Sequence, residues 1–374
     1  MSEYQYYEFQ AIDRPLDQAA QKTLRSISSR ATITATRFTN HYEWGDFKGD
    51  PRKFMERWYD LHLYFSNWGT RRLMLRLPEH FLQREALDRF LRGTDWVELW
   101  TADDNVIVDI HLEQEEPDGF WEDDESSWMP ALVPLRADVM SGDLRLFYLV
   151  WLSSVQDGEV ADGDVEPLPG MGPMTDALES LAHFLNIDSD LVEAAAEFGA
   201  DDPATSKDAL REAITALSDQ EKTALLLRVA EGDLHVAAEL KGSVRKATVA
   251  PLAGRTAGAL RKRAEEIAET RERAEAARLE AEHRRKVKEI EKARRSRLIE
   301  LRQRGESAWL EIEKEISRKL PAGYDRALNL LADLRVLATE EGTSEDFRRR
   351  LASIRDRHER KRTFVERLAE VERD

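Results

Sequence analysis

The chain has 374 residues and a formal net charge of -17, because 73 Asp and Glu outnumber 56 Lys and Arg. It contains no cysteine, which excludes disulfide bonds and zinc sites built on thiolates. Charged residues make up 34% of the chain, a high proportion that is typical of long solvated helices.

Residues 1–156 predict an α+β head domain, with a mixed sheet and helices on one face. Strands are expected where apolar and polar residues alternate, at 4–12, 31–38 and 72–77. A β-hairpin is expected from 97–101 and 106–112 around a turn at 102–105. Helices are expected at 16–27, at 51–65 with Phe54, Trp58, Leu61 and Phe65 on one face, at 83–91 and at 144–155.

Residues 157–174 are acidic and rich in proline and glycine, and they predict a linker. Residues 175–245 predict a small helical bundle, in which Ser218 and Glu221 form a capping box. The stretch 217–253 loosely resembles the helix-turn-helix of sigma-type DNA readers. Its first helix is acidic and Pro251 interrupts its second, so a plain bundle is the favoured interpretation.

Residues 246–320 predict a long charged, coiled-coil-like helix, and residues 321–374 predict a C-terminal helical hairpin or cap. Pairs such as Glu280 with Arg284 lie one turn apart in the favourable order. A helix continuous to 303 would be roughly 70 Å long. Its thin, alanine-rich seam leaves three arrangements open: a hairpin with the C-terminal helices of the same chain, a coiled coil between chains, or a solvated single helix.

The head loop at 40–50 and the segment before the third strand combine aromatic, acidic, imidazole and guanidinium groups. The candidate partner-binding residues there are His41, Tyr42, Trp44, Asp46, Phe47, Trp68, Arg71 and Arg72. Three interpretations are open: packing over the end of the sheet, recognition of a partner protein, and a catalytic set of His41, Asp46 and Arg71. We assign no catalytic residue from the sequence.

Charge is segregated along the chain. Between Arg92 and Arg136 the chain has no Lys or Arg, and this acidic tract includes the aromatic residues Phe120, Trp121 and Trp128. This combination predicts a segment that docks either on a basic partner or on the basic helix of the same chain. Residues 241–304 carry twenty Lys and Arg against ten Glu. Candidate phosphate contacts on this helix are Arg261, Lys262, Arg263, Arg284, Arg285, Lys286, Arg294 and Arg295, with a solvated helix face as the simpler interpretation.

Three runs in the head, at 8–16, 38–47 and 66–73, resemble a family of bacterial proteins without an assigned function, and the resemblance extends over most of the chain. It implies a bacterial source and no catalytic residues. The segment 324–334 is similar to helical tails of proteins with SWIM-type zinc fingers. This chain lacks the cysteines of such a finger, so the resemblance implies nothing about zinc.

We therefore expect no metal and no cofactor, because no two of the eight histidines lie one helical turn apart. The start has no signal-like segment and no apolar run reaches 18 residues, so we expect a soluble cytoplasmic protein without membrane contact. The leading hypothesis is a non-enzymatic adaptor, sensor or scaffold of a bacterial multiprotein assembly, with self-association through the long helix. The alternatives are a nucleic-acid-associated component, as in an anti-phage defence system, and an enzyme with its site in the 40–50 loop.

Overall fold

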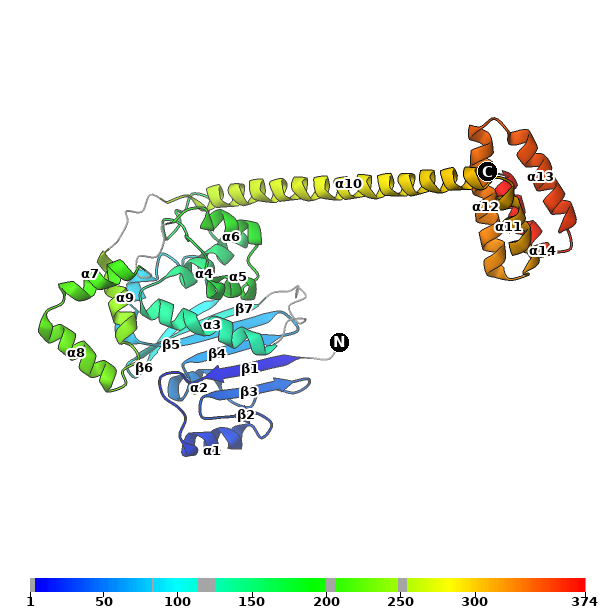
Figure 1. Cartoon of the computed structure of the whole chain (residues 1–374). Helices are drawn as coiled ribbons and strands as arrows, with labels where there is room; N and C mark the ends of the chain where they lie inside the picture. The colour runs from blue at the N-terminus through cyan, green and yellow to red at the C-terminus, as the bar shows by residue number, and fades with distance from the viewer. Residues whose placement is uncertain (1–3, 83, 114–124, 200–205, 248–253, 374) are drawn as a thin grey trace. The chain divides into compact units, whose positions relative to one another are not determined.

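The computed structural model describes residues 4–82, 84–113, 125–199, 206–247 and 254–373. The chain divides into two compact units, Met1–Arg271 and Glu272–Asp374. The predicted class is confirmed, since an α+β head is followed by a helical region that includes a long helix (Figure 1).

The head is built on a seven-stranded sheet with the order β2-β3-β1-β4-β5-β7-β6. All its strand pairs are antiparallel. The strands are β1 Gln5–Gln10, β2 Thr32–Ile33, β3 Arg37–Tyr42, β4 Leu61–Ser66, β5 Thr70–Pro78, β6 Val97–Ala102 and β7 Asn105–Glu113. The hairpin β6–β7 is confirmed, and Asp103 in its turn has a positive φ of 52°, which short hairpin turns require.

Three predicted elements of the head were wrong in extent or type. The helix expected at 51–65 ends at Arg57, and residues 61–66 form β4 at the centre of the sheet. All six residues of β4 are buried, so the strand lacks alternation, and its apolar spacing imitated a helix. The strand expected at 31–38 is interrupted by a turn, in which the amide of Thr34 donates to the carbonyl of Arg37 at 2.8 Å. The helix expected at 83–91 is limited to the short 3-10 turn Arg84–Ala86.

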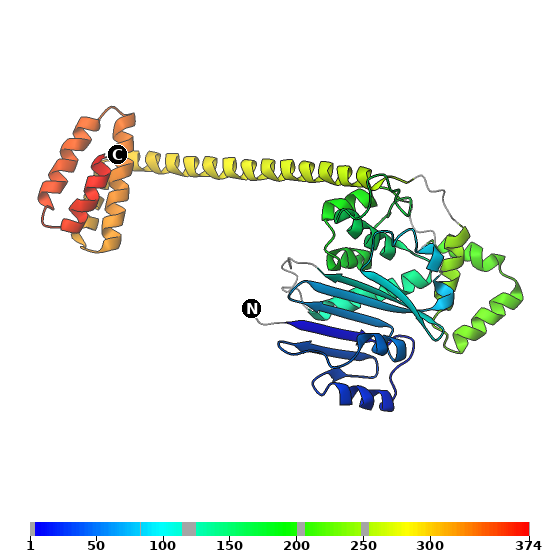
Figure 2. The ribbon, with the colours of Figure 1, turned by 180° about the vertical axis from the view of Figure 1, so that it is seen from behind.

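Helices cover both faces of this antiparallel sheet, not one face of a mixed sheet as predicted (Figures 1 and 2). On one face, side chains such as Leu75 and Val108 share a core with α3 Glu125–Met140, α4 Arg145–Gln156, α5 Asp176–Phe184 and α6 Ser189–Ala196. On the other face, Phe9 and Met74 pack against α1 Gln18–Ile27 and α2 Pro51–Arg57. Asp50 caps α2 and Pro51 occupies its first turn, as predicted.

The helices α7 Lys207–Ala216, α8 Asp219–Ala230 and α9 Val236–Ala247 follow in the same unit. The predicted capping box is confirmed, because Ser218 and Glu221 each bind the backbone amide of the other. The second helix of the resemblance to DNA readers would span residues 243–253. Its described part is not a separate element, since residues 243–247 end α9. Residues 248–253 lie outside the described part of the chain.

The long helix is α10 Ala257–Arg304, and Gly305 with a φ of 49° ends it. The second unit has its own core, which the end of α10 shares with α11 Glu306–Ser317, α12 Pro321–Glu340, α13 Ser344–Arg357 and α14 Arg362–Arg373. Every residue from 269 to 297 of α10 is exposed. The expected hairpin of this stretch with the C-terminal helices is therefore not formed.

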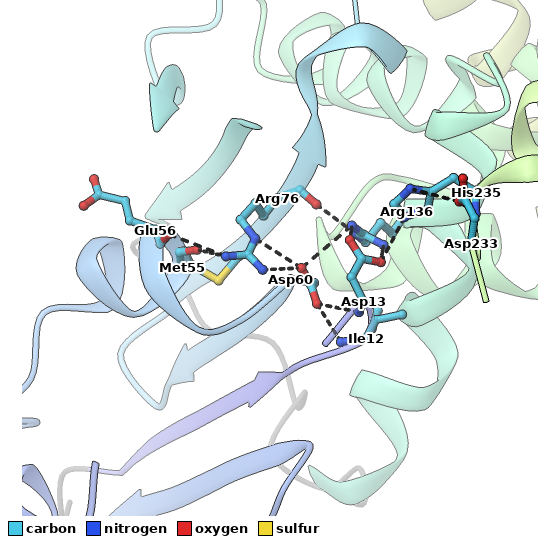
Figure 3. A network of polar contacts seen from close by, with 9 residues as sticks. All are labelled: Ile12, Asp13, Met55, Glu56, Asp60, Arg76, Arg136, Asp233 and His235. Atoms are coloured by element: carbon cyan, nitrogen blue, oxygen red, sulfur yellow. Dashed lines mark hydrogen bonds and ion pairs between the residues drawn. The ribbon is translucent and has the colours of Figure 1, made fainter. Parts of the chain in front are cut away.

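A polar network ties the far end of the sheet to the surrounding helices (Figure 3). The fully buried carboxylate of Asp60 accepts hydrogen bonds from the amides of Ile12 and Asp13 at 2.6 and 2.9 Å and from the guanidinium of Arg76 at 2.7 Å. Arg136 of α3 donates to both carboxylate oxygens of Asp13, at 2.8 and 2.5 Å, and to the carbonyl of Arg76 at 2.7 Å.

The same network reaches the loop before α9, because Nε2 of His235 lies 3.1 Å from Asp13. Burial alone would raise the pKa of Asp13. The hydrogen bonds and charges of Arg136 and His235 outweigh it, so this pKa lies below its ordinary value. The carboxylate of Asp13 thus joins β1, α3 and the segment before α9.

Residues 157–174, predicted as a linker, pack against the head. Val160 and Met171 are buried in its main core, and the buried carboxylate of Glu166 accepts from the hydroxyl of Tyr148 at 2.6 Å and pairs with Arg255 at 3.0 Å. Gly170 has a φ of 93°, and a Cβ there would lie 2.2 Å from the carbonyl oxygen of Phe198. Only glycine fits at this position.

We expect Gly170→Ala to lower the free energy of unfolding by at least about 2 kcal/mol, because the added methyl group meets backbone that cannot move aside. Gly163→Ala is the matched control in the same segment, since a Cβ there meets nothing within 4 Å. Urea unfolding monitored by tryptophan fluorescence measures both. Equal stability of the two variants would contradict the close packing of this segment.

We also expect Arg136→Met to destabilise the head by about 3–5 kcal/mol, because it leaves the carboxylate of Asp13 without its principal cation in a mostly buried network. Arg211→Met removes a fully exposed ion pair with Asp208 and should cost less than about 0.5 kcal/mol. The denaturant midpoints of the two variants, each compared with that of the unchanged chain, measure these losses of stability. A loss for Arg136→Met no greater than for the control would show that the network adds no stability.

Candidate functional site

A polar cavity of about 500 Å³ opens beside the sheet of the head. Arg72, Asp109 and His111 belong to the face that carries Met74 and Ile107, because they lie two or four positions from those residues along β5 and β7. The helices α1 and α2 cover the sheet around Met74, and the cavity lies beyond them. Its lining residues are Arg52, Arg72, Asp95, Trp96, Glu98, Asp109, His111, Leu112, Glu113, Asp157 and Glu159.

Both arginines of the cavity are already paired. Arg72 donates to both carboxylate oxygens of Asp109 at 2.8 and 2.6 Å, in the planar geometry that favours such pairs. Arg52 lies 2.7 Å from Glu98, and its guanidinium stacks 4.0 Å from the ring centre of Trp100. The two arginines therefore neutralise Asp109 and Glu98 and leave the other carboxylates of the cavity unmatched.

Those other lining carboxylates are Asp95, Glu113, Asp157 and Glu159. His111 supplies little compensation at neutral pH, because burial and the nearby charge of Arg72 lower its pKa below the ordinary value. Burial and the negative charge of Glu159 raise the pKa of Asp157. The cavity is thus a region of negative potential in which carboxylates repel one another and a bound cation would relieve that repulsion.

The cavity also has an aromatic wall, because the half-buried ring of Trp96 is one of its lining residues. An indole face beside carboxylates suits a guanidinium or an ammonium group, which the ring attracts through its quadrupole and the carboxylates bind by charge-assisted hydrogen bonds. The contact of Arg52 with Trp100 and Glu98 is the same combination made within the chain. The residues present therefore suit an organic cation.

The structure does not gather the residues predicted around the 40–50 loop into one site. Phe47 packs into the core beneath the loop, 4.9 Å from the ring of Tyr7 and 5.3 Å from that of Phe54, and the ring of Tyr42 contacts Tyr7 at 5.9 Å. His41 and Asp46 are exposed. Trp44 and Trp68 are also exposed, by 68% and 43%, and so remain available to a partner.

Arg71 and Arg72, adjacent in the sequence, lie on opposite faces of the sheet. Arg71 is buried and donates to the carbonyl of Phe184 at 2.8 Å, at the end of α5, whereas Arg72 lines the cavity. His41 and Arg71 are separated by three strand spacings, since β3, β1, β4 and β5 are successive neighbours. That is roughly 14 Å between backbones, so His41 and Arg71 are not brought together as a catalytic set.

The acidic tract is described only in part. Phe120 and Trp121 lie outside the described residues. Trp128, in α3, is buried in the main core, with its ring 5.2 Å from that of His183 and 5.8 Å from that of Phe184. Trp128 is thus a core residue here, and its position leaves it no surface for a partner.

The predicted phosphate contacts of α10 divide into two groups. Arg261 and Arg263 fasten the helix to the head: Arg261 donates to the carbonyls of Val155 and Val160 at 2.8 and 2.7 Å, and Arg263 pairs with Glu197 at 2.5 Å. The remaining members are exposed. Arg284, Arg285 and Lys286 pair with Glu280, Glu289 and Glu282 of the same helix, at 2.5, 3.1 and 2.7 Å.

Comparisons with protein-family models, with curated proteins and with solved structures find no match to this chain. The resemblance to a bacterial family and to SWIM-type tails stays a prediction. Within the described ranges no three His, Asp or Glu side chains are grouped so as to hold a metal ion. None of the helices described here combines the length and the apolar character needed to cross a lipid bilayer.

Sequence reasoning missed most of the cavity, including Asp95, Trp96, Glu98, Asp157 and Glu159. These residues come from the start of β6 and the end of α4, more than 50 positions apart, and form no local motif. Strand alternation does carry one usable signal. Alternation along residues 107–111 places Asp109 and His111 on one face of their strand. The pairing of β5 with β7 is also needed to place them on the same face of the sheet as Arg72.

His62 lies buried on the same sheet face, next to the core around Phe9. Its Nδ1 atom is 3.0 Å from the carbonyl of Glu8, and its ring stacks on Phe9 with centroids 4.0 Å apart. Burial, assisted by the charge of Arg72, lowers the pKa of His62 to about 3. The imidazole is therefore neutral in the folded protein at neutral pH.

A lowered pKa in the folded state means that the unfolded chain binds the proton more readily. We expect the stability associated with neutral His62 to be complete above pH 6.5 and to be lost as the pH falls toward 3, by on the order of 4 kcal/mol. His62→Gln should flatten the dependence of the unfolding free energy on pH in that window. The exposed His41→Gln is the control and should leave the slope unchanged, whereas an unchanged slope in His62→Gln would contradict this assignment.

Proposed function

We propose that this protein acts through protein–protein contacts, as a non-enzymatic adaptor, sensor or scaffold in a larger assembly. In this proposal the head cavity receives an arginine or lysine side chain from a basic segment of the partner. The observation that carries it is the group of lining carboxylates that the two cavity arginines leave unmatched, beside the ring of Trp96.

The cavity has the volume of an ordinary small-ligand site, which also suits one long side chain with part of its backbone. Its negative potential would accelerate the approach of a basic segment and repel nucleic acid. The exposed rings of Trp44 and Trp68 would give such a partner apolar contact elsewhere on the head. These features favour a protein partner over a nucleic-acid partner for the head.

Binding of a fluorescein-labelled eight-residue peptide with two arginines, measured by fluorescence anisotropy, tests the proposal. We expect binding that weakens as ionic strength rises, and Asp157→Asn/Glu159→Gln should raise the Kd at least about tenfold, because two charges that face the cation are lost.

Asp103→Asn/Asp104→Asn is the matched control. It removes the same number of charges in the turn of the β6–β7 hairpin, at the end away from the cavity, and asparagine tolerates the positive φ of Asp103. Its Kd should stay within about twofold of the unchanged chain, since only long-range attraction is altered. Equal losses in the two double variants would show that the peptide responds to overall charge and not to the cavity. A DNA duplex competing with the peptide for the cavity would favour the nucleic-acid alternative.

A further inference from the structure

The middle of α10 has a face that none of the described residues of the chain covers. Leu279, Val287 and Ile290 are 55%, 39% and 67% exposed. At 100° per residue these side chains fall within an arc of about 80° on the helix surface. Leu298, which is buried, and Leu301, which belongs to the core of the second unit, continue the same side. His283 and Arg294 fall on the same side, so the stripe is apolar only in part. Its apolar residues lack a packing partner among the described residues, since the helix is exposed from 269 to 297.

The two halves of this exposed stretch carry opposite charge. Residues 269–282 contain five Glu and three Arg, a net charge of -2. Residues 283–297 contain eight Lys and Arg and two Glu, a net charge of +6. Two copies aligned in parallel would place basic half against basic half. Two antiparallel copies would place each acidic half against a basic half.

We propose that α10 pairs with α10 of a second copy of this chain as an antiparallel two-helix coiled coil centred between Arg284 and Arg285. The inference is independent of the cavity in the head. With Leu279 of one copy level with Ile290 of the other, Glu275 is level with Arg294 and Glu272 with Arg297.

The apolar pair of Leu279 with Ile290 and the charge pattern therefore agree on one register. In that register Ala276 is level with Ala293, and these small side chains allow the two helices to approach closely. Arg297 forms an ion pair with Asp333, but its own side chain is 63% exposed, so it can contact a second acid at little cost. A polyanion such as DNA would use only the basic half and would leave the apolar stripe uncovered.

Cysteine cross-linking of the full chain tests this register, because the natural sequence has no cysteine to interfere. Leu279→Cys/Ile290→Cys should form a disulfide-linked dimer on oxidation, and so should a mixture of Leu279→Cys chains with Ile290→Cys chains. Each single variant alone should stay uncross-linked, since the two identical positions would be roughly 16 Å apart along the pair. Ala281→Cys/Lys288→Cys, level with each other on the opposite face, is the control that should not cross-link.

Charge reversal supplies a second measurement. Glu275→Arg and Arg294→Glu should each weaken self-association at least about tenfold in sedimentation equilibrium, and mixing the two variants should restore it as a heterodimer. Cross-linking of a single variant with itself would overturn the antiparallel register. A chain that stays monomeric at all concentrations, with or without salt-dependent binding of a DNA duplex, would overturn the proposal altogether.

Discussion

The buried carboxylate of Asp60 is the constraint on which the head depends. Asp60 directly precedes the central strand β4, and it accepts hydrogen bonds from the end of β1 and from Arg76 of β5. A carboxylate removed from water needs such hydrogen-bond partners. The ends of the neighbouring strands β1, β4 and β5 are therefore held together at Asp60. Arg136 then attaches α3 to the same point through Asp13, and His235 attaches the segment before α9. The two carboxylates of Asp60 and Asp13 together thereby align elements that are more than 200 residues apart.

The two faces of the sheet are covered unequally, and this difference produces the cavity. Helices α3 to α6 cover one face with apolar side chains, whereas α1 and α2 cover only part of the other. Where that cover ends, the strands β5 and β7 carry Arg72, Asp109 and His111 in place of apolar residues. The ion pair of Arg72 with Asp109 satisfies the charged groups next to the sheet. The lining carboxylates near the start of β6 and the end of α4 are left to interact with a bound partner.

The elements with strong local signals could be predicted from the sequence. The turn at 102–105, the cap and proline before α2, the apolar stripe of α4 and the composition of α10 each specify their structure within one short segment. The strand β4 was mistaken for helix because burial on both faces removes alternation. Helix α3 went unrecognised, since Pro130 and Pro134 lie inside it. The cavity could not be predicted, because its lining depends on which strands pair and residue spacing along the chain does not specify strand pairing.

The edges of the sheet have a consequence for the behaviour of the protein at high concentration. Outer strands with free backbone groups invite strands from other molecules and so promote aggregation. Here β2 has only two residues, and at the opposite edge the guanidinium of Arg84 donates to the carbonyl of Leu99 in β6 at 2.6 Å. The shortness of β2 and the occupied carbonyl of Leu99 thereby reduce the backbone available for strand addition at the two edges.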